Sequence, residues 1–292
     1  MKKHLLLTII SLQLFIWCNG QNSTDKYAPY QSKNYTSFYA AIKEKEQAFK
    51  LQSENENFQK DSKKLSQLTQ LQVLILKNNM FDTLPKEVGT LKNLQYFKST
   101  LNPLKKLPPE IKYWNRLAEL HLFNTSLDSF PKEMESLFTL KTLQLQNNKA
   151  DTFHLGRGCK KLTGIKTMIF YNDAFYHFPQ ELKGNISLNE LILTSCKIDS
   201  LPNDINSLSN LQTLILDSNQ IAKLPRELFE MKNLKYLSLK SNRLTSLPEK
   251  FSMLTNLETL DVSGNEITKN ELEILKALMP KCRIVYTKKE EH

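Results

Sequence analysis

Apolar residues recur along the chain at a fixed spacing, which is clearest between Leu211 and Leu234. Leu211, Leu214 and Leu216 form the pattern L-x-x-L-x-L, Asn219 follows three residues later, and a Leu-Pro pair begins five residues after Asn219. The same pattern starts again at Leu234. A self-similar period of this length is typical of repeat architectures, and it decides the fold class before any local propensity does.

The same pattern extends outward from this stretch in both directions. Seven of the eight steps between successive repeats are 23 residues long, and the step from 140 to 165 is 25 residues long. We therefore predict nine repeats over residues 71–269. They begin at Leu71, Leu94, Leu117, Leu140, Ile165, Leu188, Leu211, Leu234 and Leu257.

Each L-x-L segment has the spacing of a β-strand with one apolar face, because successive side chains of a strand point to opposite sides. One short strand cannot bury that face alone, so each coil must stack on the next. Equivalent strands one coil apart then form a parallel sheet with a spacing of about 4.8 Å. The proline of each Leu-Pro pair ends regular structure on the opposite side of the coil. The predicted fold class is α/β, a solenoid with about ten parallel strands.

The ninth position of each repeat carries a polar residue that we expect to turn inward. An asparagine amide there can hydrogen-bond the backbone of neighbouring coils and so pair groups that would otherwise be buried without partners. Thr125 keeps a donor at this position, whereas an ionised Asp173 has none and must be strained, solvated or protonated. The predicted ladder consists of Asn79, Asn102, Asn148, Cys196, Asn219, Asn242 and Asn265.

The leucine pattern, the asparagine and the Leu-Pro pairs together resemble the leucine-rich repeat family in its 23-residue LPxx type. That type occurs in Ras-associated animal and plant repeat proteins and in many bacterial surface proteins. The resemblance implies a curved solenoid with a concave parallel sheet and an irregular convex side, which binds other proteins. It implies no catalytic residues and no cofactor. The pairs are Leu84-Pro85, Leu107-Pro108, Leu201-Pro202, Leu224-Pro225 and Leu247-Pro248, with Phe130-Pro131 and Phe178-Pro179 as variants.

The first twenty residues have the pattern of a signal peptide. Lys2 and Lys3 precede an apolar run over residues 5–17, which is too short for a comfortable membrane span. Cleavage after Gly20 is one expected route, and lipidation of Cys18 is the other, although the bulky Trp17 fits a lipidation motif poorly. Either route predicts an extracytoplasmic protein that is secreted, periplasmic or on the surface of a bacterium, and Gram-negative bacteria are the favoured source.

Two terminal segments are predicted to cap the repeats. Residues 21–70 comprise a polar, flexible leader, a short helix near Phe38, and a degenerate first coil in which Leu51 takes the place of Leu74. Residues 270–292 comprise a helix that stops at Pro280, a last strand from Arg283, and a charged tail that would blunt the sheet edge. Within the irregular repeat, residues 155–159 are predicted to bulge from the convex side.

Composition and charge narrow the function classes. Only 7 glycines occur in 292 residues, so a glycine-rich phosphate loop has little to be made from. The net charge is +10, but many lysines sit beside glutamates, as in Lys86-Glu87 and Lys132-Glu133. Such mixing indicates a solvated surface rather than a nucleic-acid-binding stripe. We therefore expect no nucleic-acid partner and no enzymatic activity.

Cysteine and histidine positions indicate neither a disulfide nor a metal site. Cys159 and Cys196 lie about two coils apart, roughly 10 Å, which exceeds the reach of a disulfide. Cys282 lies several coils further on. His154, Cys159 and His177 are near one another in coil number, but their spacing matches no zinc motif. We predict free thiols and no bound metal.

The non-leucine strand positions are predicted to form the concave face. Ile169, Ile192 and Ile215 make an apolar stripe on three successive strands, and Phe123 and Tyr171 flank it. The β-propensity of isoleucine explains the stripe equally well. It explains two exposed aromatic residues less well, because aromatic side chains are frequent binding anchors. The candidate binding residues are Phe123, Ile169, Tyr171, Ile192, Ile215, Tyr96, Lys98, His121 and Asp217.

Two functional hypotheses follow. The first is a non-enzymatic module that binds a protein or peptide in the concave face of the solenoid. The second is a surface-tethered structural spacer or adhesin, a lipoprotein anchored through Cys18, which would be its one link to a membrane. An enzyme would need a catalytic domain, and residues 21–47 are too few to form one.

Overall fold

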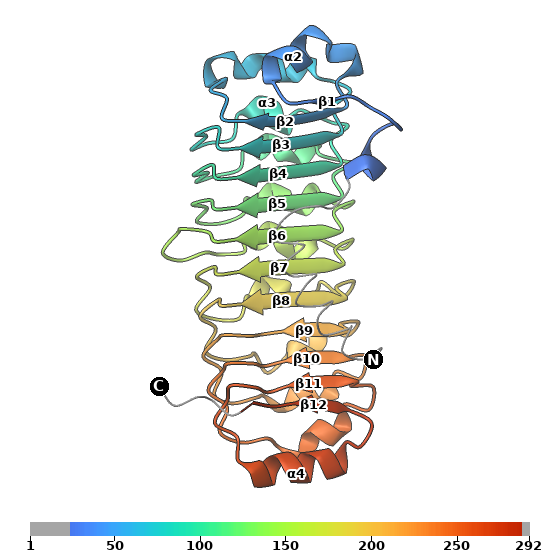
Figure 1. Cartoon of the computed structure of the whole chain (residues 1–292), viewed down its shortest axis with the longest axis vertical. Helices are drawn as coiled ribbons and strands as arrows, with labels where there is room; N and C mark the ends of the chain where they lie inside the picture. The colour runs from blue at the N-terminus through green and yellow to red at the C-terminus, as the bar shows by residue number, and fades with distance from the viewer. Residues whose placement is uncertain (1–23, 288–292) are drawn as a thin grey trace.

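The computed structural model describes residues 24–287, and within that range twelve strands form a single sheet. Neighbours in the sheet are also neighbours in sequence, from β1 to β12, and every pair is parallel (Figure 1). This order is what a chain that advances one coil at a time must produce. The predicted solenoid is confirmed, with twelve strands instead of about ten.

The nine predicted repeats each supply one strand. Pairing is offset by 23 residues in most steps, so that Leu74 lies beside Phe97 and Leu214 beside Leu237. The apolar side chains at the second position of each strand, and at the fourth in the longer strands, point into the core. The strands are β3 (Val73–Lys77), β4 (Tyr96–Thr100), β5 (Glu119–Phe123), β6 (Thr142–Gln146), β7 (Thr167–Tyr171), β8 (Glu190–Thr194), β9 (Thr213–Ile215), β10 (Tyr236–Ser238) and β11 (Thr259–Asp261).

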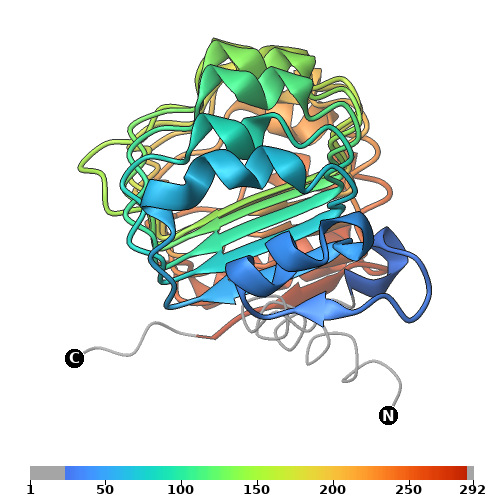
Figure 2. The same cartoon turned by 90° about the horizontal axis from the view of Figure 1, so that it is seen from above.

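Short helices form the convex side, and they stack in a layer above the sheet (Figure 2). Most begin directly after a proline, which supplies an extended residue before the first turn, as Pro225 does before η9. Apart from η3, which has nine residues, each of these helices has only three to five residues. The convex helices are η3 (Gln59–Gln67), α3 (Lys86–Gly89), η4 (Pro109–Tyr113), η5 (Lys132–Ser136), η6 (Arg157–Lys161), η7 (Gln180–Leu182), η8 (Ile205–Ser207), η9 (Arg226–Glu230) and η10 (Glu249–Met253).

The asparagine ladder joins each coil to the one before it. Asn219 is the clearest case: its Nδ2 donates to the carbonyl of Leu193 at 2.6 Å and to that of Leu216 at 2.9 Å. Its Oδ1 accepts from the backbone N–H groups of Cys196 and Ile198, both at 3.0 Å. With a third, longer contact from Nδ2 to the Asp217 carbonyl at 3.2 Å, one buried amide bonds to five backbone groups in two coils, which a leucine at this position would leave without this partner.

The residue before each ladder position has a left-handed backbone conformation. This turn ends the strand and directs the ladder side chain inward. Asparagine and glycine fill six of these ten positions because they adopt a positive φ more readily than other residues, and serine fills three. Leu101 is the exception, with a φ of 57° and an exposed side chain. The positions are Asn55, Asn78, Leu101, Asn124, Asn147, Asn172, Ser195, Ser218, Ser241 and Gly264.

Asp173 interrupts the ladder. Its Oδ1 accepts a hydrogen bond from the Asn148 N–H at 2.9 Å, while its buried Oδ2 has no partner. Burial raises the pKa of Asp173 to about 7, although hydrogen bonds from the backbone of Asn148 and Tyr171 oppose the shift. Of the three alternatives that the sequence left open, strained, solvated or protonated, the structure favours a carboxyl that holds its proton up to near-neutral pH.

The N-terminal cap differs from the prediction in its first part. Residues 24–35, expected to be a flexible leader, contain the 3₁₀ turn η1 (Thr24–Tyr27) and strand β1 (Asn34–Tyr35), which extends the sheet. Burial of Tyr35 holds this strand in place. Helix α2 (Phe38–Lys43) and the turn η2 (Lys45–Gln47) lead into β2 (Lys50–Glu54), in which Leu51 pairs with Leu74 as the spacing requires.

The C-terminal end of the core is covered by helix α4 (Lys269–Leu278). Thr268 and Glu271 form a capping box at its start, with each side chain bonded to the other residue's backbone N–H. Strand β12 (Arg283–Val285) then pairs with β11. The predicted signal peptide, Cys18 and the charged tail at residues 288–292 lie outside the described residues.

The irregular repeat places its two extra residues elsewhere than predicted. His154 pairs with Ser129, so Leu155 lies level with Phe130 and the insertion falls between the strand β6 and residue 154. The corresponding loop extends sideways after β6 in Figure 1. The predicted bulge at residues 155–159 is wrong, because Leu155 is buried and residues 157–159 form the start of η6, which packs on η5. A Cβ on Gly158 would lie 2.6 Å from the carbonyl oxygen of Lys132, so glycine permits this close approach.

We predict that Leu101→Asn stabilises the protein. Leucine at a positive φ costs roughly 1 kcal/mol, and asparagine adopts this conformation more readily. The exposed leucine side chain loses little packing on replacement. Urea denaturation should show a rise in unfolding free energy of about 0.5–1 kcal/mol. The control is Met253→Asn, an exposed apolar residue in a 3₁₀ helix without a positive φ, which should give no such gain. Equal effects of the two changes would show that Leu101 is not strained.

We predict that Asp173→Asn stabilises the protein at pH 8 by about 1–3 kcal/mol, because it removes a buried charge and restores an amide donor. The sign of the pH dependence follows from the raised pKa. The folded state binds a proton more tightly than the unfolded chain, so this contribution to stability is complete below about pH 4 and is lost as pH rises through about 7. Denaturant melts between pH 4 and 8 should show this slope in the wild type and lose it in the variant. An unchanged slope would contradict the assignment.

Candidate functional site

The candidate site is the sheet face that points away from the convex helices, which we call the concave face. All nine candidate residues lie on it, at the third, fifth or seventh position of their repeats, and the parallel register brings equivalent positions side by side. They divide into two groups. The N-terminal group on β4 and β5 comprises Tyr96, Lys98, His121 and Phe123, and the C-terminal group comprises Ile169, Tyr171, Ile192, Ile215 and Asp217.

The C-terminal group contains an apolar cluster that is separate from the solenoid core. Ile169 pairs with Ile192 and Ile192 with Ile215, and the three side chains contact one another and Tyr236. They are only 2–4% exposed, whereas the Tyr171 side chain beside them is 37% exposed. The isoleucines therefore form an apolar base, and Tyr171 is the more accessible group.

Carboxylates border this apolar cluster. Burial raises the pKa of Asp217 to about 6, against a hydrogen bond from the Ser238 hydroxyl. Burial also raises the pKa of Glu190, which precedes Ile192 by two residues on β8. Asp261 lies on β11, two strands from Asp217. On this part of the concave face the three acidic side chains are accompanied by the basic Lys240, which lies beside Asp217.

The N-terminal group is packed more tightly than the sequence suggested. Phe123, expected to be exposed, is only 5% exposed, since the Lys98 ammonium lies 4.8 Å from its ring centroid and the His121 ring lies edge-on at 6.1 Å. Tyr96 packs against the His121 ring at 5.0 Å and the Tyr27 ring at 5.8 Å. The Lys98 and His121 side chains therefore cover most of the Phe123 ring. Sequence periodicity places these residues on the same face but does not show that their side chains meet.

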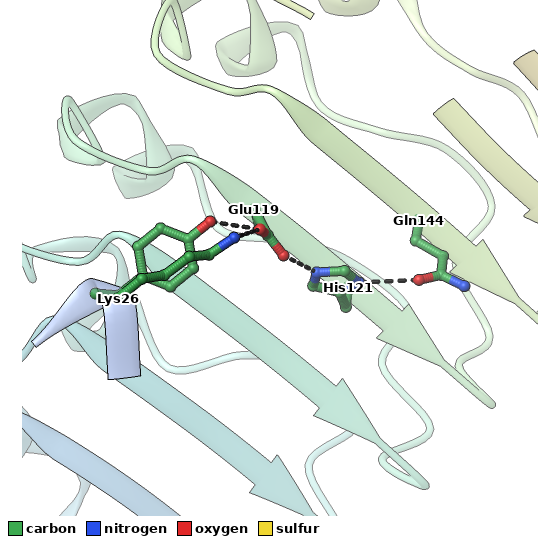
Figure 3. Close-up of polar contacts among 5 residues, drawn as sticks. Lys26, Glu119, His121 and Gln144 are labelled. Carbon is green, nitrogen blue, oxygen red and sulfur yellow. Dashed lines mark hydrogen bonds and ion pairs between the residues drawn. The ribbon is translucent and has the colours of Figure 1, made fainter. Parts of the chain in front are cut away.

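A chain of polar contacts runs from Lys26 through Glu119 and His121 to Gln144 (Figure 3). We call Glu119, His121 and Gln144, together with Tyr96, whose ring packs on His121, the Glu119 cluster. One carboxylate oxygen of Glu119 accepts from the Lys26 ammonium at 2.9 Å and from the Tyr27 hydroxyl. The other oxygen lies 2.9 Å from His121 Nε2, and His121 Nδ1 lies 3.0 Å from Gln144 Oε1. Both oxygens of this buried carboxylate are thus hydrogen-bonded, one to two donor groups and the other to His121.

Electrostatics hold Glu119 ionised. Burial alone would raise its pKa, but hydrogen bonds from His121, Tyr27 and Lys26 outweigh burial and lower the pKa to about 2. Burial and the hydrogen bond to Glu119 raise the pKa of Tyr27, so its hydroxyl remains a donor. Glu119 therefore presents a fixed negative charge that selects cationic and hydroxyl donors.

Sequence reasoning did not select Glu119, Lys26 or Tyr27 as site residues. Among the nine repeats, Glu119 and Glu190 are the two charged residues at the third position, so the sequence offered a signal that did not distinguish between them. Lys26 and Tyr27 lie in a segment without periodicity, so their contact across 92 or 93 residues could not be read from the sequence.

The structure places the rejected metal candidates apart. Cys159 is buried in the core, and His154 and His177 are exposed, with His177 3.2 Å from an Asp199 carboxylate oxygen. Among residues 24–287, no group of three or more histidine, cysteine or acidic side chains could hold a metal ion. Within the same range, no helix has the length and apolarity to cross a bilayer.

Comparison with known families agrees with the observed architecture. Two family models match, one described as a leucine-rich repeat region at residues 47–175 and one as a leucine rich repeat at residues 209–267. No curated protein gives a match. The repeat pattern, the twelve-stranded sheet and these matches agree that the chain is a leucine-rich repeat protein.

Solved structures share this fold at low sequence identity. An internalin, InlF, from Listeria monocytogenes is 22% identical with a TM-score of 0.68, over 90% of this chain and 73% of that chain. The functional domain of InlJ from Listeria monocytogenes is 19% identical with a TM-score of 0.60, over 83% and 48%. A plant peptide hormone receptor, RGFR1, in complex with RGF2 is 22% identical with a TM-score of 0.58, over 82% and 39%. These likenesses concern the fold.

We predict that thiol reactivity separates the three cysteines of the described range, which are all free. Burial raises the pKa of Cys282 to about 11, and it also raises the pKa values of the fully buried Cys159 and Cys196. Titration of the folded protein with a thiol reagent should label Cys282 slowly at most. Denaturation without reductant should release all three thiols at once. A count of one would reveal a disulfide and contradict the coil spacing.

Proposed function

We propose that this leucine-rich repeat protein is a non-enzymatic module that binds a protein or peptide on its concave face. The observation that carries the proposal is the isoleucine cluster of Ile169, Ile192 and Ile215. It lies on the concave face, outside the solenoid core, with the partly exposed Tyr171 ring beside it. An aromatic side chain beside an apolar base is a frequent arrangement of binding anchors.

The charge distribution supports a ligand with basic groups. Glu119, Glu190, Asp217 and Asp261 all lie on the concave face, where they would repel phosphate groups. A nucleic-acid partner is therefore not part of the proposal. Lys98 and Asp217 lie near the two ends of the candidate patch, and we expect them to affect encounter rate and salt dependence more than residence time.

The setting of this binding is proposed from the N-terminal sequence. Lys2 and Lys3 followed by the apolar residues 5–17 favour export, so we propose that the concave face meets its ligand outside the cytoplasm. Among the structural relatives, the plant receptor is in complex with RGF2, which shows the fold with a bound ligand in that protein.

The alternative function is a structural spacer or adhesin that is tethered through Cys18. A spacer would need only the length of the solenoid and would place no demand on the concave side chains. The two functions are separated by the effect of concave substitutions and by the chemical state of the N-terminus.

We predict that Tyr171→Ala weakens ligand binding by more than about 2 kcal/mol, roughly 30-fold in Kd, because it removes the accessible anchor of the patch. The ligand is obtained by affinity capture with the full chain from its native surroundings, and binding is then titrated. The matched control is Tyr113→Ala, which removes a tyrosine of similar exposure, 39%, from the convex helix η4. Circular dichroism confirms folding. If only the convex change weakens binding, the concave proposal fails.

We predict that the protein isolated from its native source begins at Gln21, the product of cleavage after Gly20. Intact-mass spectrometry with N-terminal fragmentation measures this directly. A protein that begins at Cys18 and carries acyl chains would support the tethered alternative. A retained N-terminus with Lys2 and Lys3 would contradict both export routes.

A further inference from the structure

The turn η1 lies on the concave face, where Tyr27 contacts Tyr96 of β4 and Glu119 of β5. These strands are three and four places along the sheet from β1, the strand that follows the turn in the sequence. We propose that the Glu119 cluster is a binding site for a basic residue followed by an aromatic residue in a partner peptide, and that Lys26 and Tyr27 of this chain occupy it until the peptide displaces them. This inference deepens the proposed function and rests on it, because it names the chemistry of one part of the concave ligand.

The cluster fits this pair of side chains through three kinds of contact. The ionised Glu119 carboxylate accepts from the Lys26 ammonium and the Tyr27 hydroxyl on the same oxygen. The Tyr27 ring packs on Tyr96, and the Lys26 ammonium lies 4.6 Å from the Tyr27 ring centroid. A cation, a hydroxyl and an aromatic face are thus recognised together, and an isolated lysine or phenylalanine would satisfy only part of the site.

The receiving groups belong to the rigid sheet and do not depend on the turn. Tyr96 and Glu119 are neighbours in the β4–β5 register, and the other contacts of Glu119 and His121 come from β5 and β6. If Lys26 and Tyr27 leave, one carboxylate oxygen loses both of its donors while the other keeps His121. The vacated oxygen can then accept from a new pair of donors, and hydrogen bonds to an ionised carboxylate are stronger than those between neutral groups.

The turn is held by surface side-chain contacts and not by burial in the core. None of the η1 residues is buried, and no residue from 28 to 34 is buried, so the first core side chain of the segment is Tyr35. A second ion pair, from the Lys50 ammonium to Asp25 at 2.5 Å, helps to hold the turn, but Asp25 is exposed. The turn can therefore detach without opening the core, and the segment acts as a built-in competitor of the peptide.

The experiment follows the His121 ring by NMR in the full chain labelled with ¹³C at histidine, with assignment by a His121→Gln variant. The probe is the synthetic peptide acetyl-TDKYAPY-amide, which copies residues 24–30. In the double variant Lys26→Ala/Tyr27→Ala, the His121 signal should move from its wild-type position. Peptide at up to millimolar concentration should return it, and Glu119→Gln in the same background should abolish the response.

The wild type should need at least tenfold more peptide than the double variant, because its own turn competes. The matched control variant is Tyr30→Ala/Lys33→Ala, which alters an exposed tyrosine and a lysine that pairs with Glu44 instead of Glu119. It should keep the wild-type His121 signal. A control peptide with alanine in place of lysine and tyrosine should have no effect.

Two results would overturn the inference: a His121 signal in the double variant that no peptide concentration moves, or wild type and double variant that respond at the same concentration. Neither result depends on the Tyr171 titration. A peptide response without a Tyr171 effect would retain this site and reject the isoleucine cluster as the main surface, and the reverse pattern would reject this site alone.

Discussion

The solenoid depends on hydrogen bonds to backbone groups that its narrow core cannot hydrate. Every coil turns inward after its strand, which buries carbonyl and N–H groups away from water, and an unpaired buried group costs about 1–3 kcal/mol. Asn219 shows the solution, since one amide bonds to groups of its own coil and of the preceding coil. Stacking of leucines supplies the stabilisation, but the ladder fixes the distance and register between coils, and so places every concave side chain.

The ladder is weakest in the middle of the array, where Thr125, Asp173 and Cys196 replace asparagine. The irregular repeat lies in the same region and needs Gly156 and Gly158 to bring η6 close to η5. These departures do not alter the strand register, because β6 and β7 still pair along their whole length. We therefore expect the departures to lower the stability of the protein and to make it depend on pH, while the concave surface keeps its geometry.

Most of the fold follows from the sequence because a repeat constrains every coil in the same way. Leu51 could be aligned with Leu74 in a degenerate coil by spacing alone. The errors have a common cause: they lie where the period is broken or absent. The insertion of the long repeat was misplaced because Leu155 and Gly156 do not resemble a Leu-Pro pair. The turn at Lys26 lies in a polar leader with no periodic pattern.

The candidate site could be predicted only as a face, since periodicity says which positions point outward and not which side chains meet there. Phe123 is covered by Lys98 and His121, which lie on the same or the adjacent strand. The contacts that mark Glu119 as a site residue come from Lys26 and Tyr27, more than ninety residues away in the sequence. In a repeat protein the core positions are fixed by stacking, and the concave positions are free to vary. Stacking alone does not require an ionised carboxylate such as Glu119 beside the buried rings of Tyr96 and His121. Glu119 is therefore the concave residue that says most about function.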